Sequence, residues 1–267
     1  MGLGMQLTAW PPELIEALAG AGYAPIVFDN RDVGLSTRFD AAGVPNLLKV
    51  SLAHALRLPI RAPYLLADMA RDTLGLLDAL GLQSAHVLGV SMGGMIAQLM
   101  AAEAPQRISS LTLIMSTSGA RSLPGPTLRA RRALLSRPRG RDIASLVEHG
   151  VGVWQTIGSP GYPADPAMLQ ARVERSIRRA YHPQGLARQL VAVAASGDRS
   201  ALLGRIRAPT QVIHGRADPL VPLACGIDLA RKIPGAQLET IDGMGHDLPA
   251  ALAPRLAALV AALARRS

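Results

Sequence analysis

Residues 85–103 read Ala-His-Val-Leu-Gly-Val-Ser91-Met-Gly-Gly-Met-Ile-Ala-Gln-Leu-Met-Ala-Ala-Glu, and this stretch decides the fold. A short apolar run ends at Gly89, a serine follows between two glycines, and an Ala-, Leu- and Met-rich helical pattern begins at once. In a strand–turn–helix context, Gly-x-Ser-x-Gly holds the serine at the tip of a sharp turn, where its hydroxyl can act as a nucleophile. Glycine at 89 and 93 removes the Cβ atoms that would collide where the strand and helix backbones approach.

On both sides of this turn, short apolar runs alternate with amphipathic helical patterns. Such alternation is typical of a mostly parallel sheet covered by helices on both faces. We therefore predict an α/β fold. The pattern predicts strands at 24–28, 85–89, 111–115, 210–214 and 236–241, and helices at 12–21, 64–80, 92–103, 223–232 and 248–265.

The alternation fails between Ser118 and Pro209, where arginine, proline and glycine punctuate the chain. Helical segments placed after a strand at the carboxyl edge of a sheet would lie over the crevice where ligands bind in such folds. We predict a helical cap over residues 119–208, inserted into an α/β core of residues 1–118 and 209–267. Its helices are expected near 126–136, 141–157, 165–180 and 184–195.

Composition limits the class of protein. The 267 residues are 49% hydrophobic, which excludes a disordered chain, and no apolar run approaches the roughly 18 residues that would span a membrane. The first charge is Glu13, so the amino-terminal residues do not resemble a secretory signal. The single cysteine, Cys225, cannot form an intramolecular disulfide and indicates a cytoplasmic location. No Cys/His cluster suggests a metal site, and no cofactor is expected.

The net charge of +9 comes from one segment. Residues 121–207 hold fifteen arginines and five acidic residues, while the rest of the chain is close to neutral. Aromatic residues make up only 3% of the chain and no nucleic-acid motif is present, so nucleic acid is not the expected partner. The arginines indicate either a solvated face or a preference for an anionic small-molecule substrate.

A serine hydroxyl needs a base to take its proton, and that base needs an acid to orient it. Where the serine sits on such a strand–turn–helix turn, these partners follow in the order serine, acid, histidine. Asp218 comes after the strand at 210–214, and His246 comes after the strand at 236–241. Asp242 is a rival acid, but it lies only four residues before His246, and a tight loop would hardly let it point back at the imidazole.

These motifs resemble the α/β-hydrolase family over essentially the whole chain. The matching segments include 28–37, 89–94, 215–219 and 243–246. Within the family, the segment Asp29-Asn-Arg-Asp-Val-Gly-Leu-Ser36 is similar to that of capped esterases of the aclacinomycin methylesterase type.

The resemblance assigns a role to each candidate residue. It implies Ser91 as nucleophile, His246 as general base and Asp218 as the orienting acid. It also implies an oxyanion hole formed by the backbone N–H groups of Met92 and Leu3.

The expected reaction is hydrolysis of a small-molecule ester, thioester or lactone through an acyl-enzyme on Ser91. Acyl transfer or carbon–carbon bond hydrolysis with the same residues stays open, as does a non-catalytic ligand-binding relative or an inactive truncated one. Trp154 and Tyr162 are expected either to line the substrate pocket or to pack the cap. Arg31 and Asp32 are expected to brace their loop by an ion pair, and the oligomeric state is left open.

Members of the family normally build two or more strands before the oxyanion loop, here Gly2-Leu3-Gly4. The first residues of this sequence correspond to the strand that carries this loop in the family. We therefore expect the codons upstream of Met1 to encode two to three further strands.

Overall fold

The sheet is parallel and follows the order of the sequence. In a computed structural model, which describes residues 1–266, β1 (Ala85–Val90), β2 (Ile108–Ile114), β3 (Thr210–Gly215) and β4 (Gln237–Ile241) are neighbours in the order β1-β2-β3-β4. The structure thus confirms the four strands predicted from residue 85 onward, to within a few residues at their ends.

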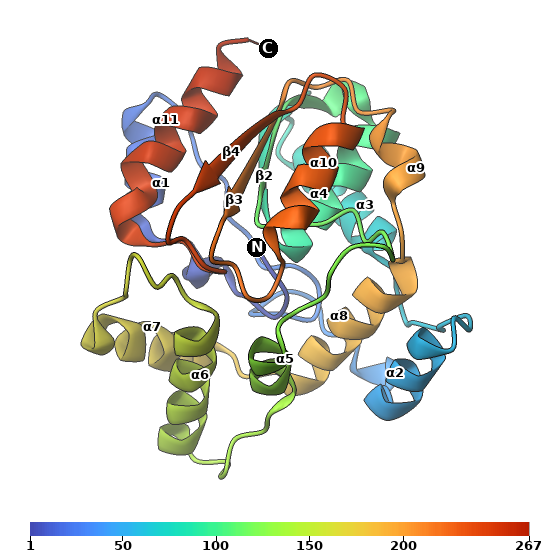
Figure 1. Cartoon of the computed structure of the whole chain (residues 1–267), viewed down its shortest axis with the longest axis vertical. Helices are drawn as coiled ribbons and strands as arrows, with labels where there is room; N and C mark the ends of the chain where they lie inside the picture. Colours follow the sequence, from blue (N-terminus) through green and yellow to red (C-terminus); the bar gives the residue numbers. More distant parts are fainter. Residues whose placement is uncertain (267) are drawn as a thin grey trace.

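Helices cover both faces of this sheet (Figure 1). On one face lie α1 (Pro12–Gly20) and α11 (Ala253–Ala264), which pack on each other. On the other lie α3 (Leu66–Ala79), α4 (Met92–Glu103) and α10 (Leu223–Lys232). The three layers are those expected of an α/β fold.

Alternation along the strands divides the core into two parts. Leu111 and Leu113 of β2 point toward the layer of α3, α4 and α10, and are fully buried there. Ile114 of β2 and Ile213 of β3 point the other way, into a cluster with Leu256 of α11. Both faces of the central strands β2 and β3 are buried, whereas β1 and β4 also carry exposed residues.

Five helices are inserted between β2 and β3. At the sheet's carboxyl end, α5 to α8 form a separate layer, drawn below the sheet in Figure 1. Polar side chains start three of these helices: Thr127, Asp142 and Asp165 each accept a hydrogen bond from a backbone N–H of the first turn. The inserted helices are α5 (Leu128–Leu135), α6 (Ile143–Ile157), α7 (Pro166–Arg179), α8 (Pro183–Ser196) and α9 (Ser200–Leu203).

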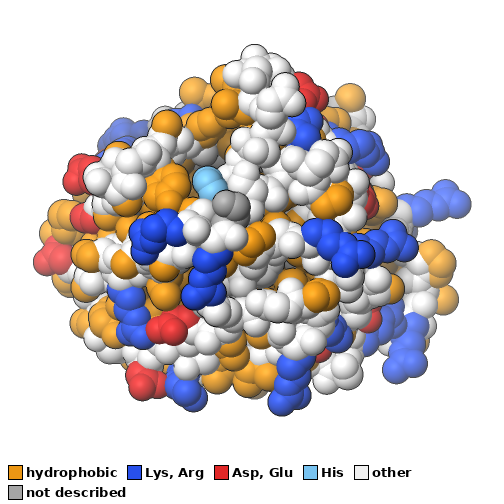
Figure 2. Space-filling model, turned by 90° about the horizontal axis from the view of Figure 1, so that it is seen from above, with side chains coloured by type: hydrophobic (Ala, Val, Ile, Leu, Met, Phe, Trp, Pro, Cys, Tyr) orange, Lys and Arg blue, Asp and Glu red, His pale blue; other side chains and the backbone are white. Residues whose placement is uncertain are grey.

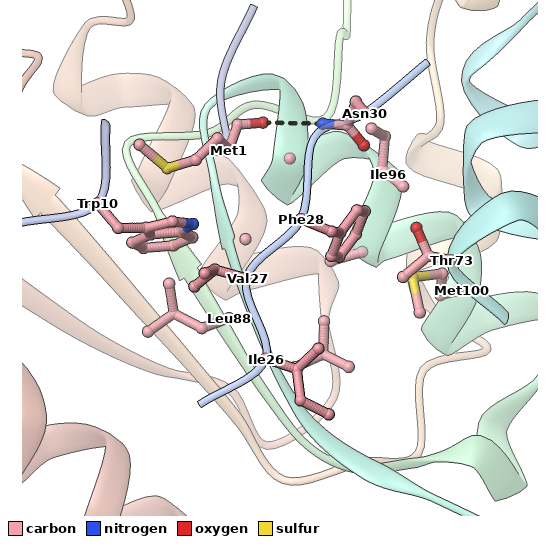
Figure 3. A pocket seen from close by; sticks show the side chains of 14 residues that line it. Met1, Trp10, Ile26, Val27, Phe28, Asn30, Thr73, Leu88, Ile96 and Met100 are labelled. Atoms are coloured by element: carbon pink, nitrogen blue, oxygen red, sulfur yellow. Dashed lines mark hydrogen bonds between the residues drawn. The ribbon is translucent and has the colours of Figure 1, made fainter. Parts of the chain in front are cut away.

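The strand predicted at 24–28 is wrong, because these residues form no strand in the structure. Ile26, Val27 and Phe28 run beside β1 and line a cavity of about 70 Å³ together with Leu88 (Figure 3). Among the described residues, no backbone hydrogen bond joins residues 24–28 to β1, and a strand exists only where its N–H and C=O groups meet those of a neighbour.

A helix that the sequence did not predict, α2 (Leu47–Ala55), lies against α8. None of its side chains is buried, and Leu48 is 81% exposed. Its apolar residues therefore do not mark a face turned toward the core. The remaining short elements are 3-10 turns: η1 (Leu7–Ala9), η2 (Asp40–Ala42), η3 (Pro105–Arg107) and η4 (Ala250–Leu252).

The surface view in Figure 2 shows Lys and Arg side chains at separate places, with hydrophobic and uncharged atoms between them. On this face the basic residues do not merge into the continuous stripe that nucleic-acid-binding proteins present. Within residues 1–266, no helix is both long and apolar enough to cross a membrane. Cys225 is buried in α10.

Candidate active site

Ser91 lies at the tip of the turn between β1 and α4. Its backbone has φ 54° and ψ −118°, and a non-glycine residue in such a conformation carries about 1–3 kcal/mol of strain. Two hydrogen bonds hold it there: the Ser91 N–H donates to Ile114 O at 2.9 Å, and the Ser116 hydroxyl donates to Ser91 O at 2.9 Å. The turn therefore fixes the Ser91 hydroxyl beyond the end of β1.

Close backbone contacts explain the glycines around Ser91. A Cβ on Gly89 would lie 2.5 Å from Gly93 O, at the crossing of strand and helix that the sequence predicted. A Cβ on Gly93 would instead meet Met1 O at 2.7 Å. The second glycine is thus required by the amino-terminal segment, a contact that the pentapeptide alone does not indicate.

The structure brings Ser91, His246 and Asp218 together into one chain of hydrogen bonds. His246 Nε2 lies 3.1 Å from Ser91 Oγ, and His246 Nδ1 lies 2.7 Å from Asp218 Oδ2. A carboxylate only accepts hydrogen bonds, so Nδ1 carries the proton and Nε2 offers its lone pair to the serine hydroxyl. His246 and Asp218 are both buried.

Asp218 is held by the loop that follows β3. Its Oδ1 accepts hydrogen bonds from the backbone N–H groups of Leu220 and Val221, each at 2.8 Å. These bonds orient the carboxylate, so that Oδ2 faces His246. The Asp218 side chain has no solvent-exposed surface.

A second histidine, His214, lies beneath this loop. Its Nε2 donates to Val221 O at 2.7 Å, while its Nδ1 is buried and has no partner among the described residues. Burial lowers the pKa of His214, and the hydrogen bond from its Nε2 ties β3 to the Asp218 loop. The sequence suggested only that His214 ends a strand.

Asp242, the rival acid, points away from the imidazole. Its side chain is 90% exposed and pairs with Arg216 Nε at 2.8 Å. Of the two carboxylates weighed from the sequence, only Asp218 contacts His246.

The amino-terminal segment passes next to Ser91. A Cβ on Gly2 would lie 3.3 Å from Ser91 Cβ, which places Gly2-Leu3 beside the serine. Among the described residues, the backbone N–H groups of Leu3 and Met92 donate no hydrogen bond within the protein. Both are therefore free to donate to a bound group.

Trp154 and Tyr162 lie in the inserted region. Trp154 of α6 packs against the cluster that includes Val173, and the Arg172 guanidinium lies 4.8 Å above its ring centre. Tyr162 packs against the core cluster of α1 and α11, next to Gly243. Both side chains serve packing, and contact of either with a substrate stays a prediction.

A second buried polar cluster lies between the loop after residue 28 and α8. Arg188, fully buried, donates to both oxygens of Asp32 at 2.8 Å, and Tyr64 donates to Asp32 Oδ2 at 2.7 Å. Burial alone would raise the pKa of Asp32, but the hydrogen bonds from Arg188, Phe39 and Tyr64 lower it below its ordinary value.

The predicted ion pair between Arg31 and Asp32 is wrong. Asp32 points inward to Arg188, whereas Arg31 pairs with Asp72 at 2.6 Å. Each residue braces its loop, but against a helix rather than against its neighbour. The positive φ of 66° at Asp32 turns the chain at this point and separates the two side chains.

Asp32, Asp40 and His182 carry ligand-type atoms within 4.8 Å of one another. Arg188 Nη2 already contacts all three, at 2.8 Å from Asp32 Oδ1, 2.8 Å from Asp40 Oδ1 and 2.9 Å from His182 Nε2. A guanidinium therefore fills the position that a cation would take, and the cluster is an ion-pair network.

Residues 2–249 match the family described as alpha/beta hydrolase fold. The chain belongs to this family, as its motifs indicated.

The relatives include enzymes with two kinds of name. Rhodomycin D methylesterases from Streptomyces sp. (strain C5) and Streptomyces peucetius are 32% and 30% identical, each over 99% of this chain and 89% of the relative. A 2-hydroxy-6-oxononadienedioate/2-hydroxy-6-oxononatrienedioate hydrolase from Cupriavidus pinatubonensis is 29% identical over 92% of this chain and 78% of its own length.

A solved structure of a meta-cleavage product hydrolase from Pseudomonas fluorescens shares the fold. It aligns with a TM-score of 0.73 at 19% identity, covering 99% of this chain and 88% of that one. The chain is thus a hydrolase of this family with esterase-named relatives.

Proposed function

We propose that this protein is a serine hydrolase that cleaves a carboxylic ester through an acyl-enzyme on Ser91. The observation that carries the proposal is the hydrogen-bonded series from Asp218 through His246 to the Ser91 hydroxyl, with distances of 2.7 and 3.1 Å. A serine hydroxyl is a weak nucleophile by itself, and a neutral imidazole aimed at its proton is the arrangement that activates it.

In the first half of the reaction, Ser91 Oγ attacks the ester carbonyl carbon while its proton passes to His246 Nε2. Asp218 stabilises the imidazolium that forms, because its Oδ2 accepts the Nδ1–H. His246 then returns the proton to the leaving alcohol as the carbon–oxygen bond breaks. In the second half, His246 takes a proton from water, and the hydroxide attacks the acyl-enzyme to release the acid and restore Ser91.

The negative charge on the carbonyl oxygen would be met by the N–H groups of Met92 and Leu3. Both belong to segments in contact with Ser91, and neither donates elsewhere among the described residues. Losing one such donor in a serine hydrolase costs about 10²–10³ in kcat. Residues 119–208 would act as a cap over this site, above a core of 1–118 and 209–267, with Trp154 and Tyr162 on its substrate side.

The relatives suggest the class of ester. The two Streptomyces relatives carry the name methylesterase, which favours a methyl ester of a larger carboxylic acid as substrate. Carbon–carbon bond hydrolysis is a second candidate, because other relatives are named as hydrolases of 2-hydroxy-6-oxo dienedioates. A cytoplasmic location, expected from the single cysteine, belongs to the same proposal.

The test is labelling of the purified protein with a fluorophosphonate, followed by mass spectrometry of the modified peptide. We expect one label, on Ser91. Ser91→Ala should remove both labelling and ester hydrolysis, with a fall in kcat of at least about 10⁴-fold. A panel of methyl and p-nitrophenyl esters, run beside a 2-hydroxy-6-oxo dienoate, separates the two candidate reactions. Full ester turnover by Ser91→Ala would refute the proposal.

A further inference from the structure

The inserted helices hold the loop that carries His246. The His246 N–H donates to Ile157 O at 2.7 Å, at the last residue of α6. The Gly245 N–H donates to Ser159 Oγ at 2.8 Å, and the Gly161 N–H donates to Gly243 O at 2.9 Å. Three hydrogen bonds from backbone N–H groups thus join residues 157–161 to residues 243–246.

Ser159 lies at the centre of this contact and bonds on both sides of the histidine. Its oxygen accepts from Gly245, the residue before His246, and its O–H donates to Asp247 Oδ1, the residue after it. Ser159 and Asp247 are both buried, with 5% and 9% of their surface exposed. One hydroxyl therefore fixes the two residues that flank the proposed base.

The two segments touch too closely for side chains at the contact. A Cβ on Gly245 would lie 2.3 Å from Gly158 O, and a Cβ on Gly161 would lie 2.8 Å from Gly243 Cα. The glycines of Gly-Met-Gly-His thus seat the histidine loop on the end of α6, and not only on the end of β4.

Burial raises the pKa of Asp247, although its hydrogen bond from Ser159 and the nearby positive charge of Arg172 oppose that shift. Arg172 is on α7, so this carboxyl also faces the inserted helices. Asp247 does not contact the His246 ring in any hydrogen bond of the described structure, whereas Asp218 does. Its bond to Ser159 instead fixes the chain on the far side of the histidine.

We propose that Ser159 is a positioning residue: it couples the inserted helices to His246, so that the base faces Ser91 only when residues 157–161 are docked on the histidine loop. This proposal rests on the proposed function, because it assumes that His246 acts on Ser91. It concerns the separate question of what holds His246 in place. An error of about 1 Å in the position of a reacting group can cost about 10²-fold in rate.

The test compares Ser159→Ala with Ser118→Ala. Ser118 is a matched control: it is buried, its hydroxyl donates to Asp228 at 2.5 Å, and it accepts from the Ala120 N–H at 3.2 Å, away from the histidine loop. Activity is expressed per mole of folded protein, measured by circular dichroism, so that misfolded protein does not count. We expect Ser159→Ala to lower kcat by about 10-fold to 10²-fold with a smaller change in KM, and Ser118→Ala to keep kcat.

Proton NMR supplies a measurement that a simple loss of stability would not change. The downfield resonance of the His246 Nδ1–H bonded to Asp218 should broaden in Ser159→Ala and stay sharp in Ser118→Ala. Ser159→Thr, which keeps the hydroxyl, should recover most of the lost kcat. If Ser159→Ala does not fold, Asp247→Ala removes the acceptor of the same hydroxyl and should show the same loss in kcat and the same broadening.

Full kcat in Ser159→Ala, or an equal loss in Ser118→Ala, would overturn the positioning role while Ser91→Ala stays inactive. Full activity in Ser91→Ala would instead mean that the proposed function has failed. The two failures are therefore distinguishable.

Discussion

Two buried carboxylates in this protein, Asp218 and Asp32, meet different bases. Asp218 pairs with the imidazole of His246, whose other nitrogen reaches Ser91. Asp32 pairs with the guanidinium of Arg188, which is surrounded by further acceptors. Neither carboxylate side chain has solvent-exposed surface.

The difference between the two pairs lies in the proton that each can move. An imidazole gains and loses a proton near neutral pH, so it can pass one from a serine to a leaving group. A guanidinium stays protonated, and the acceptors around Arg188 raise its pKa further, through its hydrogen bonds to Asp32 first of all. A buried carboxylate can thus either stabilise the fold or take part in catalysis. The base that it pairs with decides which of these two roles it has.

The largest effect expected from this comparison is on catalysis. Asp218→Asn keeps the size of the side chain and should preserve stability, but it removes the charge that orients His246. We expect kcat for a p-nitrophenyl ester to fall by about 10⁴-fold. Asp242→Asn, at the exposed pair with Arg216, is the control and should keep kcat within a few-fold. The reverse pattern would make Asp242 the acid.

The next effect is on stability. Arg188→Met leaves Asp32 buried without its main partner and should lower the free energy of unfolding by about 3–5 kcal/mol. Arg31→Met breaks a pair whose Asp72 side chain is 47% exposed, and should cost no more than about 1 kcal/mol. Urea unfolding of both variants checks this. Equal losses would mean that the buried cluster is no stronger than a surface pair.

The smallest effect is a pH dependence due to His214. Burial lowers its pKa below the ordinary 6.5, so the unfolded chain takes up a proton on this residue that the folded protein does not. Stability should therefore fall as pH drops below about 6.5. His214→Gln keeps a donor for Val221 O without the titration, and its stability should decline less between pH 7 and 5. Thermal unfolding at each pH measures the difference; parallel curves for the two proteins would exclude His214 as the source.

The features that the sequence predicted correctly depend either on residues close together in the chain or on the order of the strands. The turn at Ser91 rests on glycines within two residues of it, and the loops of Asp218 and His246 follow strands that neighbouring apolar runs define. Parallel strands then bring these loops to one edge. The fold and the meeting of the three candidate residues could be predicted in this way.

The interactions that the sequence did not predict join residues far apart in the chain. Arg188 meets Asp32 across 156 positions, and Ser159 meets Asp247 across 88. No spacing rule connects residues so far apart, and an arginine or serine in a helical insertion has no signature of its own. The strand predicted at 24–28 fails for a related reason, because a strand needs a neighbour at bonding distance and periodicity says nothing of that neighbour.

The strained backbone of Ser91 has a consequence for how this protein would change if its activity were no longer needed. Glycine adopts a positive φ without the penalty of about 1–3 kcal/mol that serine carries at this position. Replacement of Ser91 by glycine would thus yield an inactive but sturdier protein, and selection for stability alone would favour it. Serine at this position lowers the stability of the folded protein. A lineage that no longer needed the reaction should therefore replace Ser91 among the first residues that it changes.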